Sequence, residues 1–143
     1  MKTVKVPLQL INLENDGFHL LVEVVVFGHS YNVVLDTGAS KTVLDKTSIE
    51  KHIHQDDLLI SDKLSTGLGT NSMESFLLKL PLVTIGKLKI ENFEAAVLDL
   101  SIISKAYESL QLPPVVGVLG GDILKNYKAI IDYNKLELKL TCT

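Results

Sequence analysis

The sequence contains a single cysteine, Cys142. One thiol cannot form an internal disulfide, so folding does not require an oxidising compartment, while a bridge between two chains stays open. No run of about 18 apolar residues occurs, and we therefore expect no membrane span. Residues 1–7 contain no apolar core of signal-peptide length, which predicts a cytoplasmic protein if the chain is complete and an extracytoplasmic one if a leader has been removed.

Several chemical signatures are also missing. The net charge is −3 and there is no basic run, so nucleic acid is not an expected partner. The glycine run at 117–121 lacks the lysine and spacing of a phosphate loop, and no Gly-x-Ser-x-Gly elbow of a serine hydrolase occurs. His52 and His54 have no further Cys or His at ligand spacing. We expect no cofactor and no metal.

The pattern that remains is that of a mainly β protein. A length of 143 residues predicts one domain, 1–143, and 46% hydrophobic residues are enough for a packed core. Short apolar stretches with turn signals between them predict an antiparallel, closed or nearly closed β-barrel. The predicted strands are 2–13, 18–27, 31–35, 58–64, 73–85, 88–100, 129–133 and 136–141, with a short apolar stretch at 41–44.

Two or three short helices interrupt this pattern. Helices are predicted over 45–52, 102–110 and 122–127, with Asp45, Ser101 and Asp122 as their N-caps, since short polar side chains accept the free N–H groups there. We favour this capping role of Asp122 over a catalytic one. Pro7 and Pro81 lack a backbone N–H, which predicts an edge position or a bulge for each.

The rest of the chain is organised around the hexapeptide at 35–40, Leu-Asp-Thr-Gly-Ala-Ser. An apolar strand delivers Asp36 into a turn that Gly38 permits, and a buried carboxylate is costly unless it is hydrogen-bonded or used. The alternative to a catalytic Asp36 is a buried turn aspartate that backbone N–H groups satisfy. About 80 residues later, Val118, Leu119 and Gly120 end a second apolar stretch, and glycine there allows its backbone to approach the Asp36 loop closely.

Together these motifs resemble the retropepsin-like aspartic proteases, the single-lobe class of retroviral type. The resemblance spans roughly residues 22–140 and implies an acid-protease barrel with one lobe per chain. It implies that Asp36 is catalytic and that Thr37 and Gly38, with Ala39 and Ser40, form the active-site loop. The further roles that it implies are a flap that binds substrate at Gly67, Leu68, Gly69 and Thr70, and a loop-supporting motif at Val118, Leu119 and Gly120.

The resemblance also implies a homodimer acting on a peptide or protein substrate. Only one Asp-Thr-Gly is present, whereas the chemistry needs two carboxylates that share a proton. A two-fold axis would supply the second Asp36, and the chain ends, 2–10 and 136–143, are candidates for the interface. Segments 45–57 and 101–114 exceed the viral pattern and could block the cleft. The alternatives are a catalytically silent retropepsin-like module for dimerisation or peptide binding, and an unrelated peptide-binding barrel.

Overall fold

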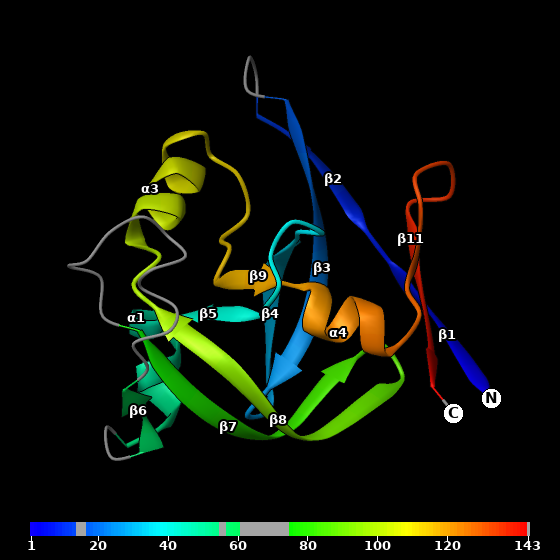
Figure 1. Ribbon diagram of the computed structural model, residues 1–143. Helices are drawn as coiled ribbons and strands as arrows, with labels where there is room; N and C mark the ends of the chain where they lie inside the picture. Colours follow the sequence, from blue (N-terminus) through cyan, green and yellow to red (C-terminus); the bar gives the residue numbers. More distant parts are fainter. Residues whose placement is uncertain (14–16, 55–56, 61–74, 143) are drawn as a thin grey trace.

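The computed structural model describes residues 1–13, 17–54, 57–60 and 75–142 (Figure 1). The strands are β1 (Lys2–Pro7), β2 (Gln9–Asn12), β3 (Phe18–Val26), β4 (His29–Leu35), β5 (Val43–Asp45), β6 (Leu59–Ile60), β7 (Phe76–Ile85), β8 (Leu88–Leu98), β9 (Gly117–Leu119), β10 (Ile130–Asp132) and β11 (Glu137–Cys142). The helices are α1 (Lys46–Ile49), a 3-10 turn η2 (Glu50–His52), α3 (Ser101–Ser109) and α4 (Gly121–Asn126). The mainly β class with short helices is confirmed.

The larger sheet closes into a barrel. Its strand order is β2-β3-β4-β9-β5-β8-β7-β6, and β3 also pairs with β7 at Val25–Thr84 and Val26–Val83. This extra pairing makes a ring of six strands, which confirms the predicted closed barrel. Alternation fills its interior: in β3, Val22, Val24 and Val26 are buried in the main core cluster, and burying such a side chain stabilises the fold by roughly 1.5–3 kcal/mol.

Strand β9 passes between two strands that flank the hexapeptide. It pairs in parallel with β4 and antiparallel with β5, through Val34–Val118 and Val43–Val118. The Asp36 loop, which links β4 to β5, therefore bends around the end of β9 (Figure 1). Two stretches that lie far apart in the sequence, the hexapeptide and residues 117–120, meet here.

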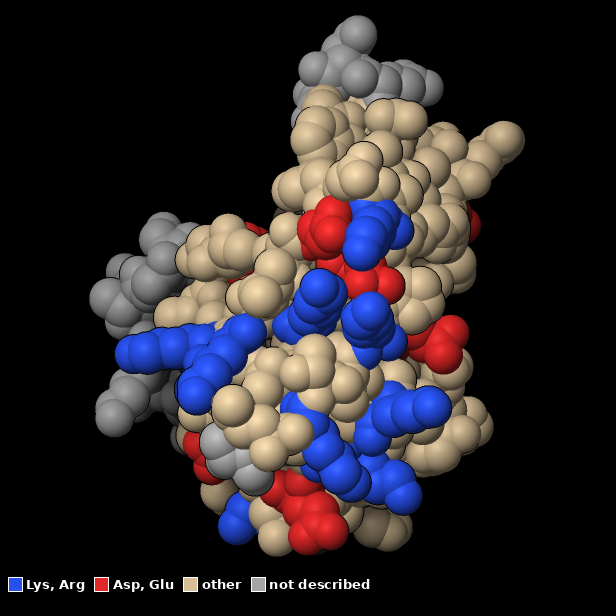
Figure 2. All heavy atoms as spheres, turned by 90° about the vertical axis from the view of Figure 1, so that its right-hand side faces the viewer, with Lys and Arg blue, Asp and Glu red and all other residues tan. Residues whose placement is uncertain are grey.

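The two chain ends form a separate three-stranded sheet, in the order β1-β11-β10. Its inner face buries Val6, Leu138 and Leu140, and on its outer face Lys5 lies directly opposite Lys139. Figure 2 shows lysines spread over the side of the molecule on which β1 and β11 lie. The sheet leaves β1 and β10 as its edge strands within the described chain.

Pro7 and Pro81 both lie where, among the described residues, the strand has no second partner. Pro7 ends the edge strand β1, and the chain then moves to the barrel, so the predicted strand 2–13 is two strands in two sheets. Pro81 lies in β7 between Leu77, which pairs with β6, and Val83, which pairs with β3. Both edge predictions are confirmed, since a missing N–H costs no ladder bond there.

One of the three predicted N-caps is confirmed. Asp45 precedes α1 and accepts the Ser48 backbone N–H, while its second oxygen accepts that of Leu100. The prediction for Ser101 is wrong, because Ser101 is the first residue of α3 and donates its N–H to Asp99. The prediction for Asp122 is also wrong: Gly120 is the cap residue of α4, and Asp122 lies in the first turn, where its carboxylate has other partners.

Two further findings concern membranes and metals. In the described part of the chain, no helix is long and apolar enough to cross a membrane. Among the same residues, no group of three or more His, Cys, Asp or Glu side chains is arranged to hold a metal ion.

Candidate active site

The Asp36 loop begins as an extension of β4. The Asp36 N–H donates to the Leu119 carbonyl at 3.0 Å, so the pairing of β4 with β9 continues through this residue. Because side chains alternate along a strand, Asp36 points to the side of the sheet that Val34 occupies, away from the barrel interior. The chain then turns, with the Ala39 N–H donating to the Asp36 carbonyl at 3.3 Å.

The Asp36 carboxylate is exposed in the single chain. One oxygen, Oδ1, accepts the Gly38 backbone N–H at 2.9 Å, and Thr37, Gly38 and Ser40 are exposed as well, while Ala39 is half-buried. The alternative of a buried turn aspartate is therefore wrong for this chain. Asp36 has the accessibility that a reacting group needs, and its position is fixed by backbone contacts on both sides.

The start of α4 supports the loop through two backbone hydrogen bonds. The Gly121 N–H donates to the Ala39 carbonyl at 2.6 Å, and the Asp122 N–H donates to the Ser40 carbonyl at 3.1 Å. A Cβ at position 120 would lie 2.6 Å from the carbonyl carbon and oxygen of Lys41. Only glycine fits at that position, because the two backbones are too close for any side chain.

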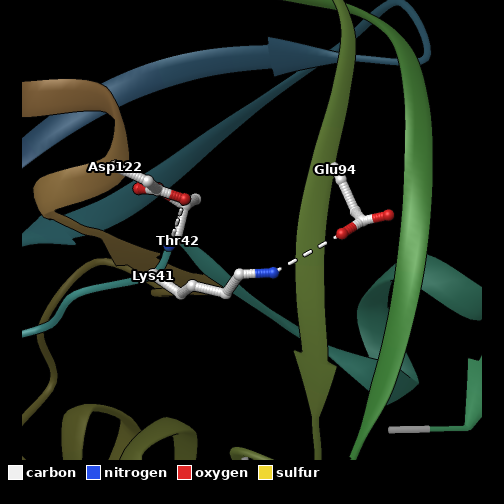
Figure 3. Close-up of polar contacts among 4 residues, drawn as sticks. All are labelled: Lys41, Thr42, Glu94 and Asp122. Carbon is white, nitrogen blue, oxygen red and sulfur yellow. Dashed lines mark hydrogen bonds and ion pairs between the residues drawn. The ribbon is translucent and has the colours of Figure 1, made fainter. Parts of the chain in front are cut away.

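A polar clamp between Thr42 and Asp122 joins α4 to the strand that leaves the loop (Figure 3). Thr42 donates its hydroxyl to Asp122 Oδ1 at 2.7 Å and its N–H to Oδ2 at 2.9 Å. The Thr42 hydroxyl oxygen also accepts the Gly120 N–H at 3.1 Å. The hydroxyl of the buried Thr42 side chain therefore both donates and accepts a hydrogen bond, as expected for a buried polar group.

Sequence reasoning missed Thr42 and assigned Asp122 to a cap. The available signal was an acid directly after Gly120–Gly121 and a threonine two residues after Ser40, both next to motifs already selected. Lys41, which lies between Ser40 and Thr42 in the sequence, makes an ion pair with Glu94 of β8 at 3.6 Å (Figure 3). Both of these side chains are partly exposed, so the pair contributes little stability.

The structure places the remaining predicted residues as follows. Val118 is half-buried in β9, Leu119 is fully buried in the barrel core, and Gly120 lies against the Asp36 loop. The predicted flap residues, Gly67, Leu68, Gly69 and Thr70, lie outside the described residues.

Comparison with known proteins agrees with this geometry. Residues 22–123 match the family model described as aspartyl protease. No curated protein matches significantly. Among solved structures, a retropepsin-like aspartic protease from Rickettsia conorii is similar, with 24% identity, a TM-score of 0.57, and coverage of 98% of this chain and 94% of that one.

Two further structures share the fold. The retroviral protease-like domain of Ddi1 from Leishmania major has 16% identity and a TM-score of 0.60, over 85% of this chain and 87% of that one. EIAV protease, in a complex with the inhibitor HBY-793, has 22% identity and a TM-score of 0.56, over 78% of this chain and 90% of that one. The matched region contains both the Asp36 loop and the Gly120 motif, and it covers most of the chain. The chain therefore belongs to the aspartyl protease family, and its fold is that of the retropepsin-like proteases.

Proposed function

We propose that the protein is a homodimeric aspartic endopeptidase in which each chain contributes Asp36. The observation that carries this proposal is an exposed carboxylate on a loop that β9 and α4 hold in place. Each chain presents one Asp36, and a two-fold axis beside the loop brings in the second. Peptide hydrolysis by such a pair needs no cofactor.

The chemistry follows from two carboxylates at close range. Like charges about 3 Å apart do not both ionise, so one Asp36 stays protonated. The ionised carboxylate takes a proton from a bound water while the water oxygen attacks the scissile carbonyl carbon. The protonated carboxyl donates a hydrogen bond to the carbonyl oxygen. A proton then passes to the leaving nitrogen as the C–N bond breaks, and the pair returns to its single-proton state.

The loop residues take supporting roles in this proposal. The Thr37 hydroxyl is exposed next to Asp36 and joins the two loops across the axis. Gly38, which already donates its N–H to Asp36, leaves the substrate backbone room to approach. Ala39 and Ser40 complete the loop and accept the N–H groups of α4 through their carbonyls, and residues 67–70, which lie outside the described residues, are the flap of this proposal.

The terminal sheet offers the partner a binding edge. Ile130 in the edge strand β10 and Tyr133 just after it are each 59% exposed, so two large apolar side chains face solvent at this edge. Packing the outer faces together would set the Lys5 and Lys139 side chains of one chain against those of the other. We therefore place the contact at the β10 edge, which the chain reaches directly after α4.

A second candidate function is a catalytically silent module that dimerises or binds peptides. The observation that favours it is the insertion α3, because this helix packs on the same side of the sheet as Asp36. If α3 keeps two loops from meeting, the single carboxylates remain without partners and no shared proton forms.

Two measurements separate these functions. Sedimentation equilibrium gives the mass, and mass spectrometry of unstructured peptides incubated at about pH 4 to 7 detects cleavage. We expect a dimer whose hydrolysis falls by about 100-fold or more in Asp36→Asn, the usual effect of removing a general acid–base group. The matched control is Glu91→Gln, an exposed acid on β8, which should cleave normally. A strictly monomeric chain, or an Asp36→Asn variant as active as the wild type, rejects the endopeptidase.

A further inference from the structure

A second apolar cluster covers the face of the sheet from which Asp36 projects. Val34 lies two residues before Asp36, on the same face, and it pairs with Leu21 of β3 on one side and Val118 of β9 on the other. The buried members of this cluster are Ile11 (6% exposed), Leu21 (1%), Val34 (8%), Tyr107 (3%) and Val115 (4%), and the partly buried members are Leu13, Leu112 and Val118. The wall beside the carboxylate is thus already covered by this chain.

The covering residues come from the insertion between β8 and β9. Tyr107 lies in α3, and Leu112 and Val115 follow that helix on the way to β9 (Figure 1). The Leu112 N–H donates to the Tyr107 carbonyl at 2.9 Å, so the segment folds back over its own helix end. The insertion therefore presents a closed apolar layer to the sheet and does not extend freely into solvent.

A hydrogen bond fixes the Tyr107 ring in this layer. The Tyr107 hydroxyl lies 2.6 Å from Nδ1 of His19, and the two rings stack with centroids 6.0 Å apart. His19 belongs to β3 and points to the same face as Leu21, two residues along that strand. Burial raises the pKa of Tyr107, so its hydroxyl stays neutral and keeps its proton for hydrogen bonding.

This layer removes the space that a large substrate side chain would need. A pocket for a leucine or phenylalanine side chain requires accessible apolar surface, whereas Leu21 and Val34 have almost none left. We propose that Tyr107, positioned by His19, closes the substrate subsite next to Asp36, so that the cleft selects peptides with a small side chain at that position. This inference rests on the proposed function, because it places a peptide beside Asp36, and it identifies Tyr107 as a specificity-determining residue.

Peptide binding to an inactive variant tests the inference without requiring hydrolysis. Labelled peptides that carry Ala, Leu or Phe at each position in turn are titrated with Asp36→Asn and followed by fluorescence anisotropy. We expect one position at which Ala is preferred over Leu and Phe by about tenfold or more, the scale on which an apolar pocket discriminates side-chain size. Adding Tyr107→Ala should remove or reverse that preference.

Two further variants keep the test interpretable. Tyr107→Phe retains the ring, loses only the bond to His19, and should keep the preference for Ala. Leu112→Ala opens the same layer at its partly buried margin, so it should shift the preference even if Tyr107→Ala does not fold. The inference is overturned if the side-chain preferences stay unchanged in both Tyr107→Ala and Leu112→Ala. It is also overturned if Asp36→Asn alone prefers bulky residues at every position, or if no variant binds peptide. A size preference in Asp36→Asn without cleavage by the wild type would instead reject the enzyme and retain the subsite.

Discussion

Thr42 donates its hydroxyl to Asp122 at 2.7 Å, and this bond ties the strand after the Asp36 loop to the helix that supports the loop. The same hydroxyl oxygen accepts the Gly120 N–H, so one side chain connects the three segments that meet beneath Asp36. None of these groups reaches the exposed carboxylate itself. Their contribution to the proposed reaction is therefore to hold the loop, which makes them positioning residues.

Removing one partner of this clamp should loosen the loop. Thr42→Val keeps the shape of the side chain but leaves the buried Gly120 N–H without its acceptor, while Asp122 Oδ1 retains only the Ile123 N–H. Leaving such a buried donor unsatisfied costs roughly 1–3 kcal/mol of unfolding free energy, which urea denaturation measures. Thr42→Ser retains the hydroxyl and should lose less than half as much. A Thr42→Val variant as stable as the wild type, with the loss confined to Thr42→Ser, would show that the methyl group, and not the clamp, matters.

The contact of Gly120 with the loop makes a sharper prediction. A Cβ at position 120 would lie 2.6 Å from the Lys41 backbone, whereas one at position 121 would lie 3.4 Å from the Ala39 carbonyl oxygen. Gly120→Ala should therefore displace the loop, with a loss of about 1–3 kcal/mol and of peptide cleavage. Gly121→Ala, one residue into α4, is the matched control and should stay close to wild type in thermal unfolding. A Gly120→Ala variant as stable as Gly121→Ala would contradict the close approach.

The barrel follows from local sequence signals, because alternating apolar residues between turn residues leave few other arrangements. The exact turn between β3 and β4 does not follow from these signals. The predicted strands 18–27 and 31–35 leave residues 28–30 for the turn, whereas the chain turns at Phe27 and Gly28, both with positive φ. This two-residue turn matches the strand twist, and tertiary pairing overrides the reluctance of phenylalanine to adopt such a φ.

The candidate site divides in the same way. Asp36 and Gly120 could be selected from their motifs, since each combines an unusual residue with an apolar strand. The partners of Asp122 and the placement of Tyr107 could not be predicted, because both depend on contacts across long sequence separations, 80 residues for Thr42–Asp122 and 88 for His19–Tyr107. A capping role is the local reading of an acid at a helix start, and here a long-range partner displaced it.

Asp99 gives α3 a pH-dependent attachment. Hydrogen bonds from the backbone and then the side chain of Ser101, with nearby lysines, lower the pKa of Asp99 below its usual value of 3.8. A lowered folded-state pKa stabilises the fold above the unfolded pKa, and this contribution is lost as the pH falls through the folded value. Asp99→Ala should therefore lower the urea midpoint at about pH 7 and lose that effect near about pH 2. A deficit of equal size at both values of pH would contradict an electrostatic attachment.

The position of the dimer contact gives the last prediction. Ile130 is 59% exposed on the edge strand β10, where we place the partner, and Ile102 is 81% exposed on α3, which lies on the opposite side of the molecule from the terminal sheet (Figure 1). Ile130→Asp would set two carboxylates near a two-fold axis and remove apolar surface, so sedimentation should show monomers, and peptide cleavage should fall with the dimer because a lone Asp36 has no partner. Ile102→Asp adds the same charge elsewhere and should remain dimeric and active. If Ile130→Asp sediments as a dimer while Ile102→Asp dissociates, the contact lies at α3, and the two Asp36 loops must then meet across the insertion and not beside the terminal sheet.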